Sequence, residues 1–227
     1  MPPASHAPAS IRTVLFDLDG TLLDTAPDLA DALNTVLIEQ GQAPLPFAQI
    51  RPVVSHGGIA LIELGFRLER SDPAFDVLRQ RLLDIYRANL SAQTRPFPGM
   101  PELLDSIEER GLNWGVVTNK PGWLTDPLLQ DLQLFDRATC VVSGDTLDER
   151  KPHPAPMLYA CEQAGSTPAQ CVYVGDAQRD IEAGINAGMH TLVAMFGYIH
   201  AEDDPHSWNA DATIDTPGEL LDWLNRH

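Results

Sequence analysis

The stretch IRTVLFDLDGT, residues 11–21, joins a short apolar run to two carboxylates. The run is rich in β-branched and aromatic residues, which is typical of a buried strand. Asp17 and Asp19 follow it directly, and Gly20 supplies a turn. Alternate residues leaving a strand point in different directions, so one carboxylate can attack a substrate while the other handles protons. We therefore expect a functional site at the end of the first strand.

Further apolar runs alternate with helical patterns along the chain. The predicted strands are 11–16, 113–118, 139–144, 171–175 and 190–196, with a weaker one near 211–214. The predicted helices between them are 101–111, 123–133, 154–165 and 178–188. Alternation of this kind favours βαβ crossovers and a parallel sheet covered by helices on both faces. We predict an α/β fold with a Rossmann-like open parallel sheet.

Residues 24–97 interrupt this alternation, because they show helical patterns and no convincing strand. One helix is expected from Pro27 to Gln40 and a long one near residues 72–90. The interval is too long for an ordinary crossover. We predict an α-helical cap domain at 24–97, inserted into an α/β core made of 11–23 and 98–227. Residues 1–10 are expected to be a disordered extension.

The overall charge excludes some classes of partner. The chain has 227 residues, with 15 Lys and Arg against 32 Asp and Glu, and a net charge of −17. We therefore expect neither a nucleic-acid nor a membrane partner. No run of apolar residues is long enough to span a bilayer, and we expect a cytoplasmic protein, monomeric or weakly dimeric. Only two of the basic residues are lysines, Lys120 and Lys151.

A second acidic cluster follows the predicted strand 171–175. Asp176 and Asp180 are four residues apart, so they share one face of the helix that begins there. Acids at a helix N-terminus also complement the helix dipole, which is the alternative explanation. Two clusters at neighbouring strand ends repel each other unless a divalent cation lies between them. Oxygen ligands of this kind favour Mg²⁺ over zinc.

Two more polar segments follow predicted strands. Thr118 and Asn119 can donate hydrogen bonds to phosphoryl oxygens, or can simply cap the next helix. Lys151 lies in a loop stiffened by Pro152 and Pro154, and it is a candidate for stabilising charge in a transition state. All these segments lie beyond the carboxyl ends of parallel strands, where open α/β sheets bind ligands.

The series D-L-D-G-T, T-N, K-P and G-D-x-x-x-D, in that order, resembles the phosphatases of the haloacid dehalogenase superfamily. The resemblance extends over nearly the whole chain from Ile11. It implies that Asp17 is the nucleophile that forms an aspartyl-phosphate. It also implies that Asp19 protonates the leaving oxygen and then activates water, while Lys151 neutralises developing charge.

The same resemblance implies the binding roles. Thr118 and Asn119 would hold the phosphoryl oxygens of a small phosphorylated metabolite. Mg²⁺ would be bound by Asp17, the backbone carbonyl of Asp19, and Asp176. Asp180 would orient Lys151 or support the ligands of the metal.

The substrate stays open at this point. The TNKP motif and the cap resemble phosphoglycolate phosphatases, whereas segment 196–211 is more similar to the N-acetylmuramic acid 6-phosphate phosphatases of bacterial cell-wall recycling. We favour the muramyl substrate, with phosphoglycolate as the alternative. A sugar phosphomutase shares the core motifs. A non-catalytic phosphate-binding module is disfavoured because Asp17 and Asp19 are both present.

The cap should contribute the residues that bind the leaving group, since it covers the site. Ser55, His56 and Gly57 interrupt the cap helices and are candidates for substrate contact; the alternative is a plain helix–turn–helix joint. Arg51 is a candidate partner for a substrate carboxylate. Tyr198 and His200, just beyond the strand 190–196, are expected at the rim of the site.

Overall fold

The computed structural model describes residues 10–227, and the expected extension at 1–10 lies outside this range except for Ser10. Six strands form one parallel sheet in the order β5-β4-β1-β6-β7-β8. They are β1 (Thr13–Phe16), β4 (Asn113–Val117), β5 (Cys140–Val142), β6 (Cys171–Gly175), β7 (His190–Ala194) and β8 (Ala212–Ile214). Strand β1 is central, since Phe16 pairs with Val116 on one side and Val174 on the other. The predicted open parallel sheet is confirmed.

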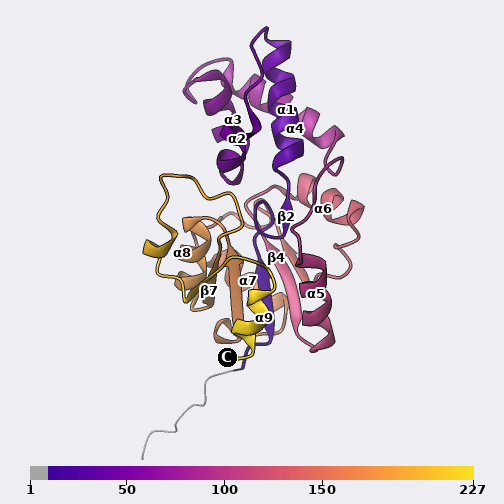
Figure 1. Ribbon diagram of the computed structural model, residues 1–227, viewed down its shortest axis with the longest axis vertical. Helices are drawn as coiled ribbons and strands as arrows, with labels where there is room; N and C mark the ends of the chain where they lie inside the picture. The colour runs from indigo at the N-terminus through magenta and orange to yellow at the C-terminus, as the bar shows by residue number, and fades with distance from the viewer. Residues whose placement is uncertain (1–9) are drawn as a thin grey trace, which may run out of the picture.

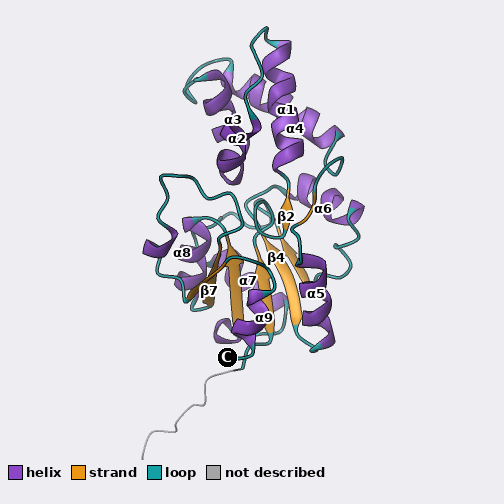
Figure 2. Cartoon of the chain, viewed as in Figure 1, coloured by secondary structure: helices purple, strands orange, loops and turns teal. Residues whose placement is uncertain are grey.

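Helices cover both faces of the sheet, as Figure 2 shows. They are α5 (Met100–Glu109), α6 (Gly122–Asp131), α7 (Ala155–Gln163), α8 (Gln178–Ala187) and α9 (Glu219–Leu224), with short 3₁₀ turns η2 (Pro168–Gln170) and η3 (Pro205–Ser207). Val14 and Phe16 pack in the cluster that includes residues of α5, α6 and α9. Leu15, between them, packs with residues of α7 and α8. Alternate β1 side chains therefore serve two buried layers, which explains its continuous apolar sequence.

The cap rises above the carboxyl edge of the sheet (Figure 1). It consists of α1 (Ala26–Glu39), α2 (Phe47–Ile50), the 3₁₀ helix η1 (Arg51–His56), α3 (Gly57–Phe66) and α4 (Phe75–Ala88). Both predicted long helices are present: α1 has Pro27 in its first turn, and α4 has the expected apolar face, with Leu78, Leu82 and Tyr86 buried. Among residues 10–227, no helix is long and apolar enough to cross a membrane.

The cap joins the core through a two-stranded antiparallel ribbon, β2 (Leu23–Asp24) and β3 (Arg95–Pro96). The prediction that residues 24–97 contain no strand is therefore wrong at both ends of the interval. The chain leaves the core and returns to it at one point, so the two crossings run side by side and pair their backbones. A strand of two residues has no periodicity that a sequence pattern can reveal.

Candidate active site

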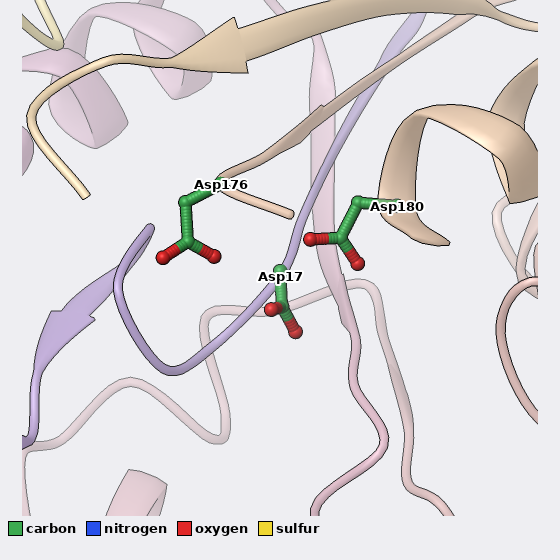
Figure 3. A group of neighbouring side chains, drawn as sticks. All are labelled: Asp17, Asp176 and Asp180. Atoms are coloured by element: carbon green, nitrogen blue, oxygen red, sulfur yellow. The ribbon is translucent and has the colours of Figure 1, made fainter. Parts of the chain in front are cut away.

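Three neighbouring strands bring polar side chains to one edge of the sheet. Asp17 follows β1, Thr118 follows β4 and Asp176 follows β6. The chain moves outward from β1 through β4 and β5, then returns to β6 on the other side of β1. Such a reversal opens a crevice at the carboxyl edge of the sheet. The carboxylates of Asp17, Asp176 and Asp180 converge there, each offering an oxygen within 4.8 Å of the others (Figure 3).

Lys151 lies between two of these carboxylates. Its Nζ is 2.8 Å from Asp17 Oδ1 and 2.8 Å from Asp180 Oδ1. It also donates to the Tyr173 hydroxyl at 2.7 Å, and its side chain is 1% exposed. A buried ammonium is tolerated only when it is paired and hydrogen-bonded, and both conditions hold here. The structure thus brings together Asp17, Lys151 and Asp180 as the sequence predicts.

Asp176 has no cation of its own among the described residues. Its Oδ2 accepts hydrogen bonds from Ser55 Oγ at 2.7 Å and from the Tyr198 backbone N–H at 2.8 Å. Its Oδ1 is buried without a hydrogen-bond partner in the described part of the chain. Burial, with the charges of Asp17 and Asp180 adding to it, raises the pKa of Asp176 to about 7. Lys151 thus pairs with two of the three carboxylates, and Asp176 is left without a direct cationic partner among the described residues.

These residues fit a divalent cation. A bound cation would give the Asp176 oxygen the partner that it lacks among the described residues, and it would offset the excess of buried negative charge. The backbone carbonyl of Asp19 is close by, because Ser55 Oγ lies 3.5 Å from it and also bonds Asp176. A side chain at Gly20, whose φ is +85°, would collide with the Asp176 carboxylate. Gly20 therefore lets the loop after β1 approach closely enough to offer its carbonyl oxygen.

Asp19 is held by a residue to which the sequence assigned no role, Lys120. Lys120 Nζ donates to Asp19 Oδ1 at 2.8 Å and to the Tyr86 hydroxyl of the cap at 2.9 Å. Thr25 Oγ1 donates to the same Asp19 oxygen at 2.6 Å. Burial lowers the pKa of Lys120, but the charges and hydrogen bonds of Asp19 and Tyr86 together outweigh burial, and the net shift of this pKa is upward. The scarcity of lysine was the available signal, since one of only two lysines lies here.

Thr118 and Asn119 lie at the end of β4, as expected, but their side chains contact different parts of the chain. Thr118 is buried, and its Oγ1 accepts a hydrogen bond from the Lys120 backbone N–H at 3.1 Å. The carboxamide of Asn119 binds both backbone groups of Lys151, donating to its carbonyl at 3.0 Å and accepting from its N–H at 3.1 Å. The Asn119 side chain therefore positions the loop that carries Lys151.

A cavity of about 870 Å³ lies between the core and the cap. From the core it is lined by Asp17, Asp19, Thr118 and Asn119, among others, and from the cap by residues that include Ser55, His56, Gly57 and Tyr86. The three predicted residues of the cap turn thus face the site. Burial and the neighbouring Arg179 lower the pKa of His56, so its imidazole is neutral near pH 7.

Arg51 and Tyr198 belong instead to the joint between cap and core. Arg51 donates to the carbonyls of Phe196 and Gly197, each at 3.1 Å, and its guanidinium lies 4.8 Å from the centre of the Tyr198 ring. The expectation that Tyr198 lies at the rim is wrong, since it is buried and its hydroxyl bonds Asp24 at 2.6 Å. These hydrogen bonds join residues that are 145 to 174 positions apart in the sequence, so no local pattern reveals them. Neither Arg51 nor His200 is among the residues that line the cavity.

A parallel α/β core that gathers carboxylates and a lysine at one sheet edge, beneath a helical cap, defines a capped α/β hydrolase. Residues 14–194 match the family model described as haloacid dehalogenase-like hydrolase. The chain belongs to this haloacid dehalogenase-like hydrolase family, and its named relatives are phosphatases.

Two relatives illustrate how the family divides. The chain is 43% identical over 216 residues to an N-acetylmuramic acid 6-phosphate phosphatase of Pseudomonas aeruginosa, covering 95% of this chain and 96% of the relative. It is 45% identical over 206 residues to a phosphoglycolate phosphatase of Xylella fastidiosa, covering 91% and 90%. A crystal structure described as a predicted phosphoglycolate phosphatase from Haemophilus somnus superposes with a TM-score of 0.83 at 28% identity, covering 94% of this chain and 97% of that one.

Proposed function

We propose that the protein is a Mg²⁺-dependent phosphomonoesterase that hydrolyses N-acetylmuramic acid 6-phosphate through an aspartyl-phosphate on Asp17. One arrangement carries the proposal: Asp17, paired with Lys151 at 2.8 Å, faces a cavity of about 870 Å³ and lies beside an oxygen of Asp176 that has no hydrogen-bond partner in residues 10–227. A reaction on this substrate would belong to the recycling of cell-wall sugars.

The nucleophile is Asp17. Lys151 holds its Oδ1, which leaves the second carboxylate oxygen to attack phosphorus. As the Asp17–phosphorus bond forms, the ester P–O bond breaks and Asp19 gives its proton to the leaving oxygen. Asp19 then takes a proton from water, whose oxygen attacks phosphorus. Inorganic phosphate leaves and the Asp17 carboxylate is restored.

Charge is the main obstacle to this reaction, because a carboxylate and a phosphate dianion repel each other. Asp17, the Asp19 carbonyl and Asp176 would hold Mg²⁺, which neutralises the phosphoryl oxygens when it is bound. Lys151 adds a fixed positive charge at Asp17 itself. The Thr118 hydroxyl, just beyond the end of β4 and in the cavity wall, would donate to a phosphoryl oxygen.

The choice of substrate is supported by the size of the cavity. A volume of about 870 Å³ suits a sugar-sized leaving group, whereas glycolate would fill only a small part of it. Phosphoglycolate is the second candidate, because relatives of nearly the same identity carry that name.

Phosphate release across a panel of substrates tests the proposal. The panel contains N-acetylmuramic acid 6-phosphate, N-acetylglucosamine 6-phosphate, phosphoglycolate and a nucleoside monophosphate, each with Mg²⁺ and with EDTA. We expect the highest kcat/KM with the muramyl substrate and no release in EDTA. A kcat/KM for phosphoglycolate that exceeds the muramyl value would overturn the substrate. A requirement for a bisphosphate activator, without release of free phosphate, would indicate a phosphomutase.

A further inference from the structure

Arg79, on the cap helix α4, has no carboxylate partner in the part of the chain that the structure describes. It is partly buried, and its Nε is fully buried with no hydrogen-bond partner among residues 10–227. No carboxylate in the described part of the chain lies within 4.0 Å of its guanidinium nitrogens. A buried donor that is left unpaired costs folding free energy. Such a group is explained when the missing partner is a ligand.

Arg79 faces the substrate cavity. Arg79, Leu83 and Tyr86 are spaced i, i+4 and i+7 along α4, so they share one face of the helix, and all three line the cavity. The stem of Arg79 packs toward the first turn of α3, where a Cβ placed on Gly58 would lie 3.9 Å from its Cγ. The base of the Arg79 side chain on α4 therefore lies beside α3, and Arg79 forms part of the cavity wall.

The other basic side chains of the cavity wall differ from Arg79. Arg70 is paired with Glu63 at 2.9 Å, Arg179 donates to the Ser55 carbonyl at 2.7 Å, and Lys120 is paired with Asp19. Arg150 is exposed, so water satisfies its guanidinium. Arg79 is thus the arginine of this wall that combines burial with an unpartnered donor among the described residues.

The position of Arg79 on α4 also fixes how far its guanidinium lies from the phosphoryl group of a substrate. The hydroxyl of Tyr86 lies 2.9 Å from Lys120 Nζ, which in turn holds Asp19. Seven residues separate Tyr86 from Arg79, a rise of about 10 Å along the helix axis. The group that Arg79 binds is therefore well separated from the phosphorus atom.

We propose that the Arg79 guanidinium binds a carboxylate on the leaving group, so that the enzyme selects phosphomonoesters of carboxylate-bearing sugars. The inference rests on the proposed function and assigns a specificity residue to it. A planar guanidinium binds a carboxylate through two parallel hydrogen bonds. In N-acetylmuramic acid 6-phosphate the sugar ring separates the lactyl carboxylate from the phosphate, as the position of Arg79 requires. In phosphoglycolate a single methylene separates the carboxylate from the ester oxygen, which is too short.

The test compares two substrates that differ by the lactyl group alone, N-acetylmuramic acid 6-phosphate and N-acetylglucosamine 6-phosphate. We expect Arg79→Gln to lower kcat/KM for the muramyl substrate by about 10- to 100-fold, mainly through KM, because a charge-assisted pair is lost. The value for N-acetylglucosamine 6-phosphate should change by less than about threefold, within the range of a peripheral substitution. Arg79→Lys keeps the charge without the planar fork and should give an intermediate loss.

Arg70→Gln is the matched control, because it also removes a positive charge from the cavity wall but breaks an exposed pair with Glu63. It should leave the ratio of the two kcat/KM values unchanged. An equal loss on both substrates in Arg79→Gln would overturn the inference while leaving the proposed function intact. A wild-type enzyme that cleaves neither sugar phosphate would instead overturn the proposed function. A wild-type preference for phosphoglycolate would overturn the argument that the substrate carboxylate must lie far from the phosphate to reach Arg79.

Discussion

The core and the cap of this molecule carry charge in different ways. Residues 24–97 have seven basic and nine acidic side chains, whereas the rest of the chain has eight basic and 23 acidic ones. In the core, three buried carboxylates lie together at the sheet edge, and Lys151 pairs with two of them. In the cap, Arg79 faces the cavity without a carboxylate partner in residues 10–227. The acidic core therefore requires a cation before an anionic substrate can approach, and the cap offers that substrate a positive charge directly.

The difference assigns separate tasks to the two regions. A change in the core cluster should alter the chemical step for every substrate, because the phosphoryl group is common to all of them. A change in the cap should alter the response to one part of the leaving group. Substitutions in the core, in the cap and at the contacts between them test this division.

The largest effect is expected from Asp17→Asn. The amide is not a nucleophile, so kcat should fall by about 10⁴-fold or more for every substrate of the panel. The substitution removes one charge from a repelling cluster, so the variant should fold and melt at least as high as wild type in EDTA. Phosphate release and a thermal melt check both expectations. Retained Mg²⁺-dependent turnover would contradict the proposed mechanism.

The second prediction concerns the stability of the metal-free core. Burial and neighbouring charges raise the pKa of Asp176 from 3.8 to about 7, so the native state binds a proton that the unfolded chain releases. That stabilisation is present below about pH 4 and is lost as the pH rises through 7. The loss amounts to at most about 4 kcal/mol of unfolding free energy.

Melts in EDTA at pH 5 and pH 8 measure this effect. We expect the Tm of the wild-type protein to fall by about 5–10 °C between the two values, beyond the change seen in Asp176→Asn. Mg²⁺ should restore the wild-type Tm at pH 8 and leave the variant unchanged. Equal pH dependence in both proteins would show that Asp176 is not the group responsible.

The third prediction tests a contact between the core and the cap. Lys120 holds Asp19 in the core and the Tyr86 hydroxyl in the cap. Lys120→Met should lower kcat by about 10²-fold for all substrates with little change in KM, because Asp19 is no longer oriented for proton transfer. Tyr86→Phe keeps the Lys120–Asp19 pair and is the matched variant; it should lower kcat by less than about tenfold. An unchanged kcat in Lys120→Met would limit Lys120 to a structural role.

The ease of prediction also separates the two regions. Asp17, Asp176 and Asp180 could be found because each follows a buried strand of recognisable pattern, and parallel strands end at one edge. The role of Lys120 could not be predicted, because its contact with Tyr86 depends on how α4 packs over the core. The ribbon of β2 and β3 is too short for any periodicity.

The contacts of side chains whose partners are distant in sequence could not be predicted either. Arg51 is an arginine in the cap, and nothing local distinguishes it from Arg79. The tertiary structure directs Arg51 to the carbonyls of Phe196 and Gly197, and Arg79 to the cavity. For the same reason the Asn119 amide pairs with Lys151, 32 residues away, in place of the free donor expected from its position after β4.

The smallest effect is expected at the joint itself. The Tyr198 hydroxyl donates to Asp24 at 2.6 Å and accepts from the Ala26 backbone N–H at 2.9 Å, which fixes β2 and the start of α1 to the core. Tyr198→Phe leaves both groups without this partner and should lower the unfolding free energy by about 1–2 kcal/mol. In a chain of this size the Tm should fall by about 2–8 °C.

Measuring kcat of the Tyr198→Phe variant shows whether the joint between cap and core affects catalysis as well as stability. The backbone N–H of Tyr198 that binds Asp176 is kept in the phenylalanine variant, so kcat should stay within about threefold of wild type, the range of a peripheral change. Tyr159→Phe, on the core helix α7 and away from the joint, is the control for loss of a tyrosine hydroxyl. A Tm equal to that of wild type would show that the joint does not depend on the Tyr198 hydroxyl and is held by its other contacts, among them the Arg51 hydrogen bonds and the ring contacts of Tyr198 with Phe97 and Arg51. A large loss of kcat would instead show that the position of the cap limits the chemical step, and the division of tasks between core and cap would fail at this point.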